Sequence, residues 1–292
     1  MAPVYKIALC QFNPKLPGTD QFSPQVAKVA ESFALAESYL RLAADKGCHL
    51  AVLPEFHLTS WEPSHPDFIA AMKESMSCLA KYQALARELD INIIPGTLCE
   101  SYTGERGEEE LKNVAYFLAA GTGDICGSYQ KKNLWHPERP YLTPGRDPHL
   151  AFGTPLKDIN GKSLRAGLLI CWDLTFPEGF RALVQDGADL IIIPAYWSTA
   201  GGEDIRQLNG DAETVFLDSV LTARAFENNA VVVFCNAGGL SRVTLPILGS
   251  LGSIPPGEDK VEVFDVDLDV LRVAEERYKI RKDMQSLEWH YK

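Results

Sequence analysis

Short runs of apolar and β-branched residues alternate along this chain with longer segments in which apolar residues recur every three or four positions. The short runs are typical of buried strands, and the longer segments are typical of amphipathic helices. Strands are expected at residues 6–12, 49–54 and 91–98, separated by helices at about 24–46 and 66–89. This order predicts an α/β fold in which helices cover a sheet of continuous apolar strands.

A hairpin interrupts this order in the middle of the chain. Two strands expected at 113–120 and 125–133 are separated by Gly121-Thr122-Gly123-Asp124, whose turn residues at this spacing predict an antiparallel connection. The sheet should therefore be mixed. The remaining expected elements are strands at 166–170, 190–194, 230–235 and 261–266 and helices at 177–185 and about 211–228.

No composition shift, linker, repeat or low-complexity segment divides the sequence. The 292 residues would also suffice for two ordinary domains. We nevertheless expect a single domain over 1–292, with a core at about 4–275 and a polar, charged C-terminal extension at about 276–292.

Charge and hydropathy exclude several kinds of partner. A net charge of −11 does not suit a nucleic-acid-binding surface, because such a surface neutralises phosphates with Lys and Arg. No apolar run approaches the roughly 20 residues that span a bilayer, and the N-terminus enters an expected strand without a signal-peptide pattern. We expect a cytoplasmic protein without nucleic-acid or membrane partners.

Standard metal and cofactor signatures are missing from the sequence. The seven cysteines include no C-x-x-C pair, so neither a disulfide framework nor a zinc site is indicated. There is also no P-loop, no G-x-G-x-x-G after a strand, no H-E-x-x-H and no G-x-S-x-G. We expect no metal and no cofactor.

Reactive side chains follow several of the expected strands, where α/β proteins place their sites. Cys171 directly follows an apolar strand and precedes a Pro177-Glu178 helix start, so its thiol should emerge at a strand-to-helix turn. A thiol there can act as a nucleophile if a base or a positive charge favours the thiolate. Cys235 also ends an apolar strand and is the alternative, and either cysteine could equally be a buried apolar residue.

A carboxylate and a lysine pair stand at two other strand ends. Glu55 follows Pro54, which cannot continue a strand ladder, and a half-buried carboxylate there can act as a general base and then as an acid. Lys131 and Lys132 end the second strand of the hairpin, where a buried ammonium could stabilise an oxyanion. Taken singly, these residues also fit an exposed loop glutamate and an exposed lysine pair.

Four sequence strings together resemble the carbon–nitrogen hydrolase family, the nitrilase superfamily. They occur in the family's order: LAVLPEF, YQKKNL, GLLICWDLTFPEGFRALVQDGADLIIIPAYW and ARAFENNAVVVFCNAGG. The resemblance implies a four-layer α-β-β-α sandwich with mixed sheets. It also implies hydrolysis of nitriles, amides or N-carbamoyl compounds without a metal, by homodimers or higher homo-oligomers.

The same resemblance implies a catalytic Glu-Lys-Cys triad of Glu55, Lys131 and Cys171. Lys131 is favoured over Lys132 because it is third in the Y-x-K pattern. Glu138 resembles the family's second carboxylate, which positions the lysine and the substrate. The expected mechanism is attack by Cys171, oxyanion stabilisation by Lys131 and the backbone N–H of Trp172, and hydrolysis of a thioester. Aromatic residues expected to line the pocket, although they fit a core as well, are Trp172, Trp135, Tyr196 and Trp197.

Departures from the family pattern bear on the substrate. Asp173 stands at the position where the true nitrilases of the family that this sequence resembles have a glutamate. This difference favours a small amide or N-carbamoyl substrate over a nitrile. Leu174 and Thr175 replace the arginines with which N-carbamoyl amino-acid hydrolases bind a carboxylate, so we expect the preferred substrate to lack a carboxylate at this distance unless another arginine binds it. The segment 239–254 also differs from the family's usual glycine-containing pattern.

Other classes of function remain open at this point. A nitrilase would use the same residues, whereas a cysteine peptidase or acyltransferase would use Cys171 with a histidine base, His57 or His136. A binding protein without catalysis could share the fold.

Overall fold

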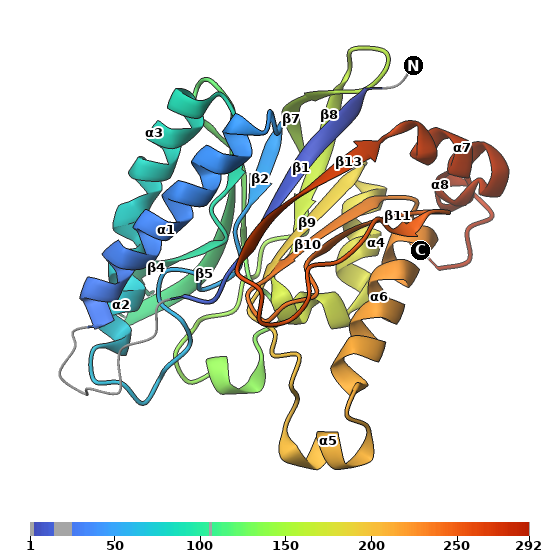
Figure 1. Ribbon diagram of the computed structural model, residues 1–292. Helices are drawn as coiled ribbons and strands as arrows, with labels where there is room; N and C mark the ends of the chain where they lie inside the picture. The colour runs from blue at the N-terminus through green and yellow to red at the C-terminus, as the bar shows by residue number, and fades with distance from the viewer. Residues whose placement is uncertain (1–2, 15–24, 105–106, 292) are drawn as a thin grey trace.

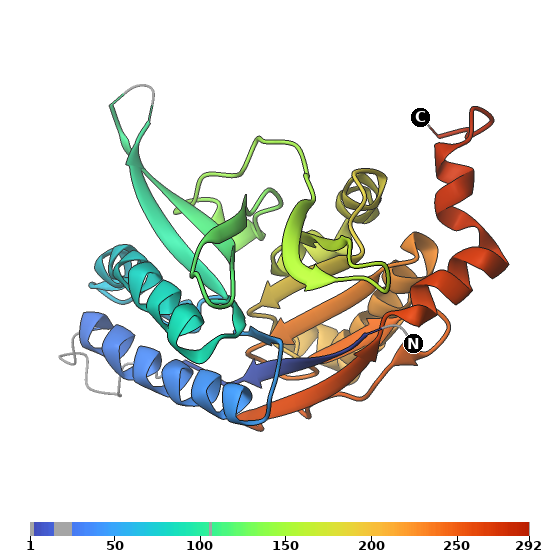
Figure 2. The same cartoon turned by 90° about the horizontal axis from the view of Figure 1, so that it is seen from above.

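The computed structural model describes residues 3–14, 25–104 and 107–291. Its core is two mixed β-sheets packed face to face (Figures 1 and 2). The first has the order β13-β1-β2-β3-β5-β4, with β6 also paired to β5. Its strands are β1 (Val4–Gln11), β2 (Leu50–Val52), β3 (Asn92–Ile94), β4 (Thr97–Thr103), β5 (Glu109–Leu118), β6 (Ile125–Gln130) and β13 (Lys260–Asp267).

The second sheet has the order β12-β11-β10-β9-β8-β7. Strands β8, β9 and β10 are parallel, and the pairs at both edges are antiparallel. The strands are β7 (Phe152–Lys157), β8 (Ser163–Leu168), β9 (Leu190–Ala195), β10 (Val231–Asn236), β11 (Arg242–Leu245) and β12 (Gly249–Ser250).

Side-chain alternation along the strands produces the layers. In β1, Ile7 and Leu9 pack against residues of the second sheet, whereas Ala8 and Cys10 pack against helices α1 (Gln25–Asp45) and α3 (Leu79–Leu89). Helices α4 (Pro177–Gln185) and α6 (Ala212–Asn228) cover the outer face of the second sheet (Figure 1). The expected four-layer α-β-β-α sandwich is therefore confirmed.

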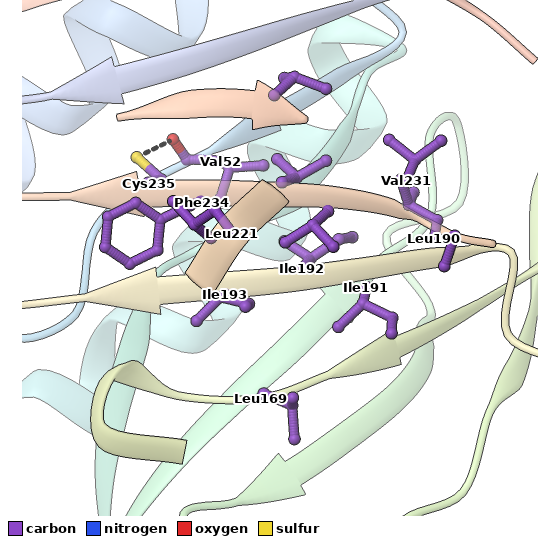
Figure 3. Close-up of a cluster of buried hydrophobic side chains, with 14 of the residues drawn as sticks. Val52, Leu169, Leu190, Ile191, Ile192, Ile193, Leu221, Val231, Phe234 and Cys235 are labelled. Carbon is purple, nitrogen blue, oxygen red and sulfur yellow. Dashed lines mark hydrogen bonds between the residues drawn. The ribbon is translucent and has the colours of Figure 1, made fainter. Parts of the chain in front are cut away.

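The main core cluster, which contains side chains of both sheets, is mainly aliphatic (Figure 3). The consecutive residues Ile191, Ile192 and Ile193 of β9 are all fully buried, because helices cover one face of this sheet and the first sheet covers the other. Cys235 of β10 donates a hydrogen bond from its thiol to the carbonyl of Val52, at 3.1 Å, and thus links the two sheets.

Several expected elements differ in their bounds. The helix expected at 66–89 is divided into α2 (Phe68–Glu74), a 3₁₀ turn η1 (Ser75–Cys78) and α3. The strand expected at 91–98 is two strands, β3 and β4, because Gly96 has φ +58° and a Cβ there would meet the carbonyl of Pro54. The second hairpin strand ends at Gln130 instead of residue 133.

Other elements were not predicted. Strands β7, β11 and β12 were missed, and so were helices α5 (Glu203–Leu208), α7 (Asp269–Tyr278) and α8 (Ile280–Gln285). The charged end of the chain is helical because it packs on the body of the protein: Arg281 bonds the side chain of Asp189 and the carbonyls of Ala188 and Asn229. Residue 24, where the first helix is expected to begin, lies outside the described residues. Of the helices in the described ranges, none combines the length and apolar character needed to cross a bilayer.

Candidate active site

Glu55 lies in the turn that follows β2, and its side chain is only 1% exposed. Phe56, the next residue, has φ +49°, so the chain reverses sharply at this point. The carboxylate accepts three hydrogen bonds. Its Oε1 accepts from Asn113 Nδ2 at 2.8 Å and from Lys131 Nζ at 2.9 Å, and its Oε2 accepts from the backbone N–H of Tyr196 at 3.0 Å. The position of Glu55 is therefore fixed from three segments of the chain.

Lys131 directly follows β6 and is also 1% exposed. Its ammonium donates to Glu138 Oε1 at 2.7 Å as well as to Glu55. Burial alone lowers the pKa of this lysine, but Glu55, Cys171 in its thiolate form and Glu138 raise it above its ordinary value. Lys132 points elsewhere and donates to the carbonyl of Asp147 at 2.8 Å. Only Lys131 joins the buried carboxylates.

Glu138 is the last residue of a short 3₁₀ helix, η2 (His136–Glu138). Its second oxygen accepts the backbone N–H of Trp135 at 2.7 Å. Burial raises the pKa of Glu138 to about 7; Lys131 opposes this rise, whereas the charge of Glu55 adds to it. Glu138 is thus a carboxyl group that titrates near neutral pH.

Cys171 opens a 3₁₀ turn, η3 (Cys171–Thr175), three residues after the end of β8. Its φ is +44°, which is unusual for a residue with a Cβ and typical of strained turns at functional sites. The charges of Glu55, Lys131 and Glu138 all influence the pKa of the Cys171 thiol. Burial and then Glu55 raise the pKa of Cys171, whereas Lys131 and a hydrogen bond from the Tyr196 backbone lower it, and the net result is a pKa well above the ordinary value.

Asp173 connects the cysteine turn to the segment that carries the lysine. Its Oδ2 accepts the backbone N–H of Ile170 at 3.0 Å and the hydroxyl of Tyr129 at 2.9 Å. Its Oδ1 accepts the backbone and side-chain N–H groups of Asn133 at 2.9 and 2.8 Å. The carboxylate therefore binds both neighbours of the site, the end of β8 and the end of β6.

The four aromatic residues expected near the site differ in their placement. Trp172 and Trp197 are half-buried and their rings are 5.3 Å apart. Tyr196 is half-buried beside Phe56, and its backbone contacts the carboxylate of Glu55. The ring of Trp135 is 46% exposed, and it is the backbone of this residue that contacts Glu138.

Two of the residues considered as an alternative nucleophile or base, Cys235 and His57, have other hydrogen-bond partners. Cys235 lies in the core between the sheets, where its thiol is bonded to Val52. Both ring nitrogens of His57 are also engaged, Nδ1 with the carbonyl of Pro54 at 3.0 Å and Nε2 with the hydroxyl of Tyr82 at 2.7 Å. Burial lowers the pKa of His57 to about 3, so it is neutral at physiological pH. His136 is exposed on η2.

Sequence reasoning missed Asn113, Tyr129 and Asn133, which hold the acidic groups in place. Asn113 had a detectable signal, because a polar side chain inside an apolar strand needs hydrogen-bond partners when buried. The described residues hold no group of His, Cys, Asp and Glu side chains suited to a metal ion. The arrangement can supply a thiol, a carboxylate to take its proton, and a fixed positive charge.

Comparison with known proteins identifies the family. The model of the carbon–nitrogen hydrolase family matches residues 6–275. This chain belongs to the carbon–nitrogen hydrolase family. Its relatives include a nitrilase of Pyrococcus abyssi, 28% identical over 86% of this chain and 89% of the relative. An N-carbamoylputrescine amidase of Oryza sativa is 29% identical, over 84% and 80% of the two chains.

Solved structures of the family share this fold. The crystal structure of an amidase from Nesterenkonia sp. superposes with a TM-score of 0.69 at 25% identity, covering 96% of this chain and 95% of the amidase. Variants of that amidase have been solved in complex with butyramide and with acrylamide added to the active-site cysteine. At 24% and 23% identity, those two structures are evidence for the fold alone.

Proposed function

We propose that this protein hydrolyses a small amide or N-carbamoyl compound through a thioester at Cys171 and releases ammonia. The observation that carries the proposal is the buried ammonium of Lys131, bonded to Glu55 at 2.9 Å and to Glu138 at 2.7 Å beside the thiol of Cys171. A buried cation held by two carboxylates is costly to fold, so a chemical role is a reason for its presence.

In the first half of the reaction, Glu55 takes the thiol proton and the sulfur attacks the carbonyl carbon of the substrate. The resulting oxyanion is stabilised by Lys131 and by the backbone N–H of Trp172. When the C–N bond breaks, Glu55 returns the proton to the leaving nitrogen, and ammonia departs. The enzyme is left as a thioester with Glu55 again ionised.

In the second half, Glu55 takes a proton from a water molecule, and the hydroxide attacks the thioester carbon. The C–S bond breaks, the sulfur recovers the proton from Glu55, and the acid product leaves. An N-carbamoyl substrate would give a carbamic acid, which decomposes to an amine and carbon dioxide. Glu138 holds Lys131 in place through both halves.

The raised pKa of Cys171 supports this order of proton transfer. Because burial and Glu55 disfavour the thiolate, the resting cysteine is a thiol that must lose its proton as it attacks. His57 is an unsuitable base because both of its nitrogens have partners. A carboxylate base therefore fits this site better than the histidine of a cysteine peptidase.

The proposal favours amides over nitriles because of Asp173, although a nitrilase is among the relatives and remains the second candidate. One of these relatives is named a nitrilase and another an N-carbamoylputrescine amidase, so similarity alone does not distinguish a nitrile substrate from an N-carbamoyl substrate.

Release of ammonia from matched substrates tests the proposal. We expect an aliphatic amide or N-carbamoyl amine to have a kcat/KM at least tenfold above that of the corresponding nitrile. Cys171→Ala should abolish turnover and leave the circular dichroism spectrum unchanged, since it removes only one thiol from a turn. Near-normal turnover in folded Cys171→Ala would reject Cys171 as the nucleophile, and a faster nitrile would favour the nitrilase.

A further inference from the structure

A cavity of about 400 Å³ is lined by residues that flank the candidate active-site residues in the chain. Its size falls within the usual range for small-molecule pockets. Two of its lining residues, Lys132 and Trp172, are the immediate neighbours of Lys131 and Cys171 in the chain. The full lining is Lys132, Asn133, Leu134, Arg139, Leu142, Pro144, Trp172 and Phe176.

The charges on this cavity have one sign. Lys132 and Arg139 are its ionisable residues, and no aspartate or glutamate lines it. Two positive charges on one small cavity are notable in a protein whose net charge is −11. An anionic ligand would be attracted to this wall, and a cationic ligand would be repelled.

Neither cation has a carboxylate partner within the part of the chain that the structure describes. Lys132 donates to the carbonyl of Asp147, and Arg139 donates from Nε to the carbonyl of Leu134 at a long 3.4 Å. Neither takes part in any ion pair among the described residues, whereas Lys131, the residue before Lys132, forms two ion pairs. The terminal N–H groups of Arg139 are thus free to bind a planar anion such as a carboxylate.

The rest of the wall suits a short hydrocarbon chain. Leu134 and Leu142 are buried and belong to an apolar cluster that also includes Phe56, beside Glu55. Trp172 and Phe176 also line the cavity, with ring centroids 6.5 Å apart. An apolar wall with a cationic end matches a substrate that has an acid group at one end.

We propose that the substrate is a carboxylate-bearing amide, such as the monoamide of a dicarboxylic acid, whose carboxylate is bound by Arg139 with help from Lys132. The inference rests on the proposed amidase function and assigns its charge preference. Arg139 supplies the arginine that Leu174 and Thr175 do not provide after the cysteine.

Three amides of nearly equal shape and different charge test the preference. Glutaramate carries a carboxylate, glutaramide is neutral and 4-aminobutanamide carries an ammonium group. We expect the wild-type kcat/KM for glutaramate to exceed that for glutaramide at least tenfold, equivalent to about 1.4 kcal/mol, and 4-aminobutanamide to be the poorest. Equal or better hydrolysis of the neutral or cationic amide overturns the inference.

Variants of Arg139 identify the residue responsible. Arg139→Gln should raise KM for glutaramate tenfold or more, with kcat and the kinetics on glutaramide changed less than about threefold. Arg139→Lys should retain part of the affinity. Arg146→Gln removes an exposed arginine of the same loop that does not line this cavity, and it should behave as wild type. An equal loss on glutaramate and glutaramide in Arg139→Gln would indicate a structural role and reject the carboxylate site.

Binding separates this inference from the proposed function. Calorimetry with glutarate and Cys171→Ala measures the anion site without turnover, and Arg139→Gln added to this variant should weaken binding about tenfold. Binding that depends on Arg139 supports the site even if no amide is hydrolysed, which would reject only the amidase function. Absence of glutarate binding, or binding indifferent to Arg139, overturns the inference.

Discussion

At Lys131, one buried ammonium bonds two buried carboxylates, those of Glu55 and Glu138. When all three groups are ionised, the cluster carries one net negative charge in a region of low dielectric. A buried negative charge is unfavourable, and two pKa values reflect this. Burial raises the pKa of Glu138 to about 7, and it raises the pKa of Cys171 so that the thiol stays protonated. Lys131 itself keeps its proton, because the surrounding negative charges outweigh the effect of burial.

Glu138 should make folding stability depend on pH. Its pKa is about 7 in the folded protein, compared with an ordinary value of 4.5, so between these values the folded state binds more protons than the unfolded state. The free energy of unfolding should therefore fall as pH rises from about 4.5 to 7. Urea unfolding at pH 5 and pH 8 measures this fall, and Glu138→Gln should reduce it. An unchanged pH dependence in Glu138→Gln would assign the titration to another group.

Lys131 and Lys132 should differ in both activity and stability. Lys131→Met should lower kcat on glutaramide by about 10²–10³, the usual effect of losing an oxyanion donor. It should also reduce the free energy of unfolding by about 3–5 kcal/mol at pH 8, because it leaves buried carboxylates without a partner. Lys132→Met, which removes the same charge one residue away, should change both quantities little on this neutral substrate. Similar losses in the two variants would contradict the assignment of Lys131.

Among the elements, η3 and the segment after β6 have to be placed relative to each other, since one carries Cys171 and the other carries Lys131. They come from different sheets, so no strand pairing sets their distance. Asp173 does so instead, by accepting four hydrogen bonds from Ile170, Tyr129 and Asn133. It also holds the backbone next to Cys171, whose positive φ needs support from its surroundings.

Asp173→Asn tests this connection. The asparagine keeps the size of the side chain, but its NH₂ group would face donors, so we expect a loss of about 2–4 kcal/mol in the free energy of unfolding. Turnover and the rate of Cys171 alkylation should both fall. Glu178→Gln, which neutralises an exposed carboxylate at the start of α4, should change stability by less than about 0.5 kcal/mol. Normal alkylation and turnover in folded Asp173→Asn would show that the cysteine turn keeps its conformation without the Asp173 carboxylate, and would contradict this prediction.

For the whole molecule, the position of the site follows from the packing of the two sheets. Glu55 and Lys131 follow strands of the first sheet, and Cys171 and Tyr196 follow strands of the second, so the groups meet only when the sheets pack. The main core cluster contains side chains of both sheets, which favours our proposal that the chain is a single domain. The extension at 276–292 packs on this body through Arg281 and Met284.

We also expect the protein to form a homodimer or a higher homo-oligomer. Helix α6 exposes Val215 and Phe226 on one face, three turns apart, and the ring of Phe226 contacts Tyr278 of α7. Light scattering coupled to size-exclusion chromatography should give at least twice the mass of the chain, 32.3 kDa. Phe226→Glu should shift the mass toward the monomer, whereas Glu178→Gln should not. A wild-type mass of one chain would contradict the prediction.

The sequence alone determined the fold class and pointed to the groups that we propose as reactive, because these depend on local patterns. Strand and helix periodicity is a property of neighbouring residues, so helices at 177–185 and 212–228 were found almost to the residue. The family strings likewise pointed to Glu55, Lys131 and Cys171. Tertiary structure decided everything that depends on distant segments. The strands β7, β11 and β12 and the C-terminal helices form because they pack on other parts of the chain, which their own sequences do not reveal. The support of Glu55 by Asn113 and Tyr196, the three bonds that Tyr129 and Asn133 donate to Asp173, and the cationic cavity at Arg139 all join segments far apart in the chain that only the tertiary structure brings together.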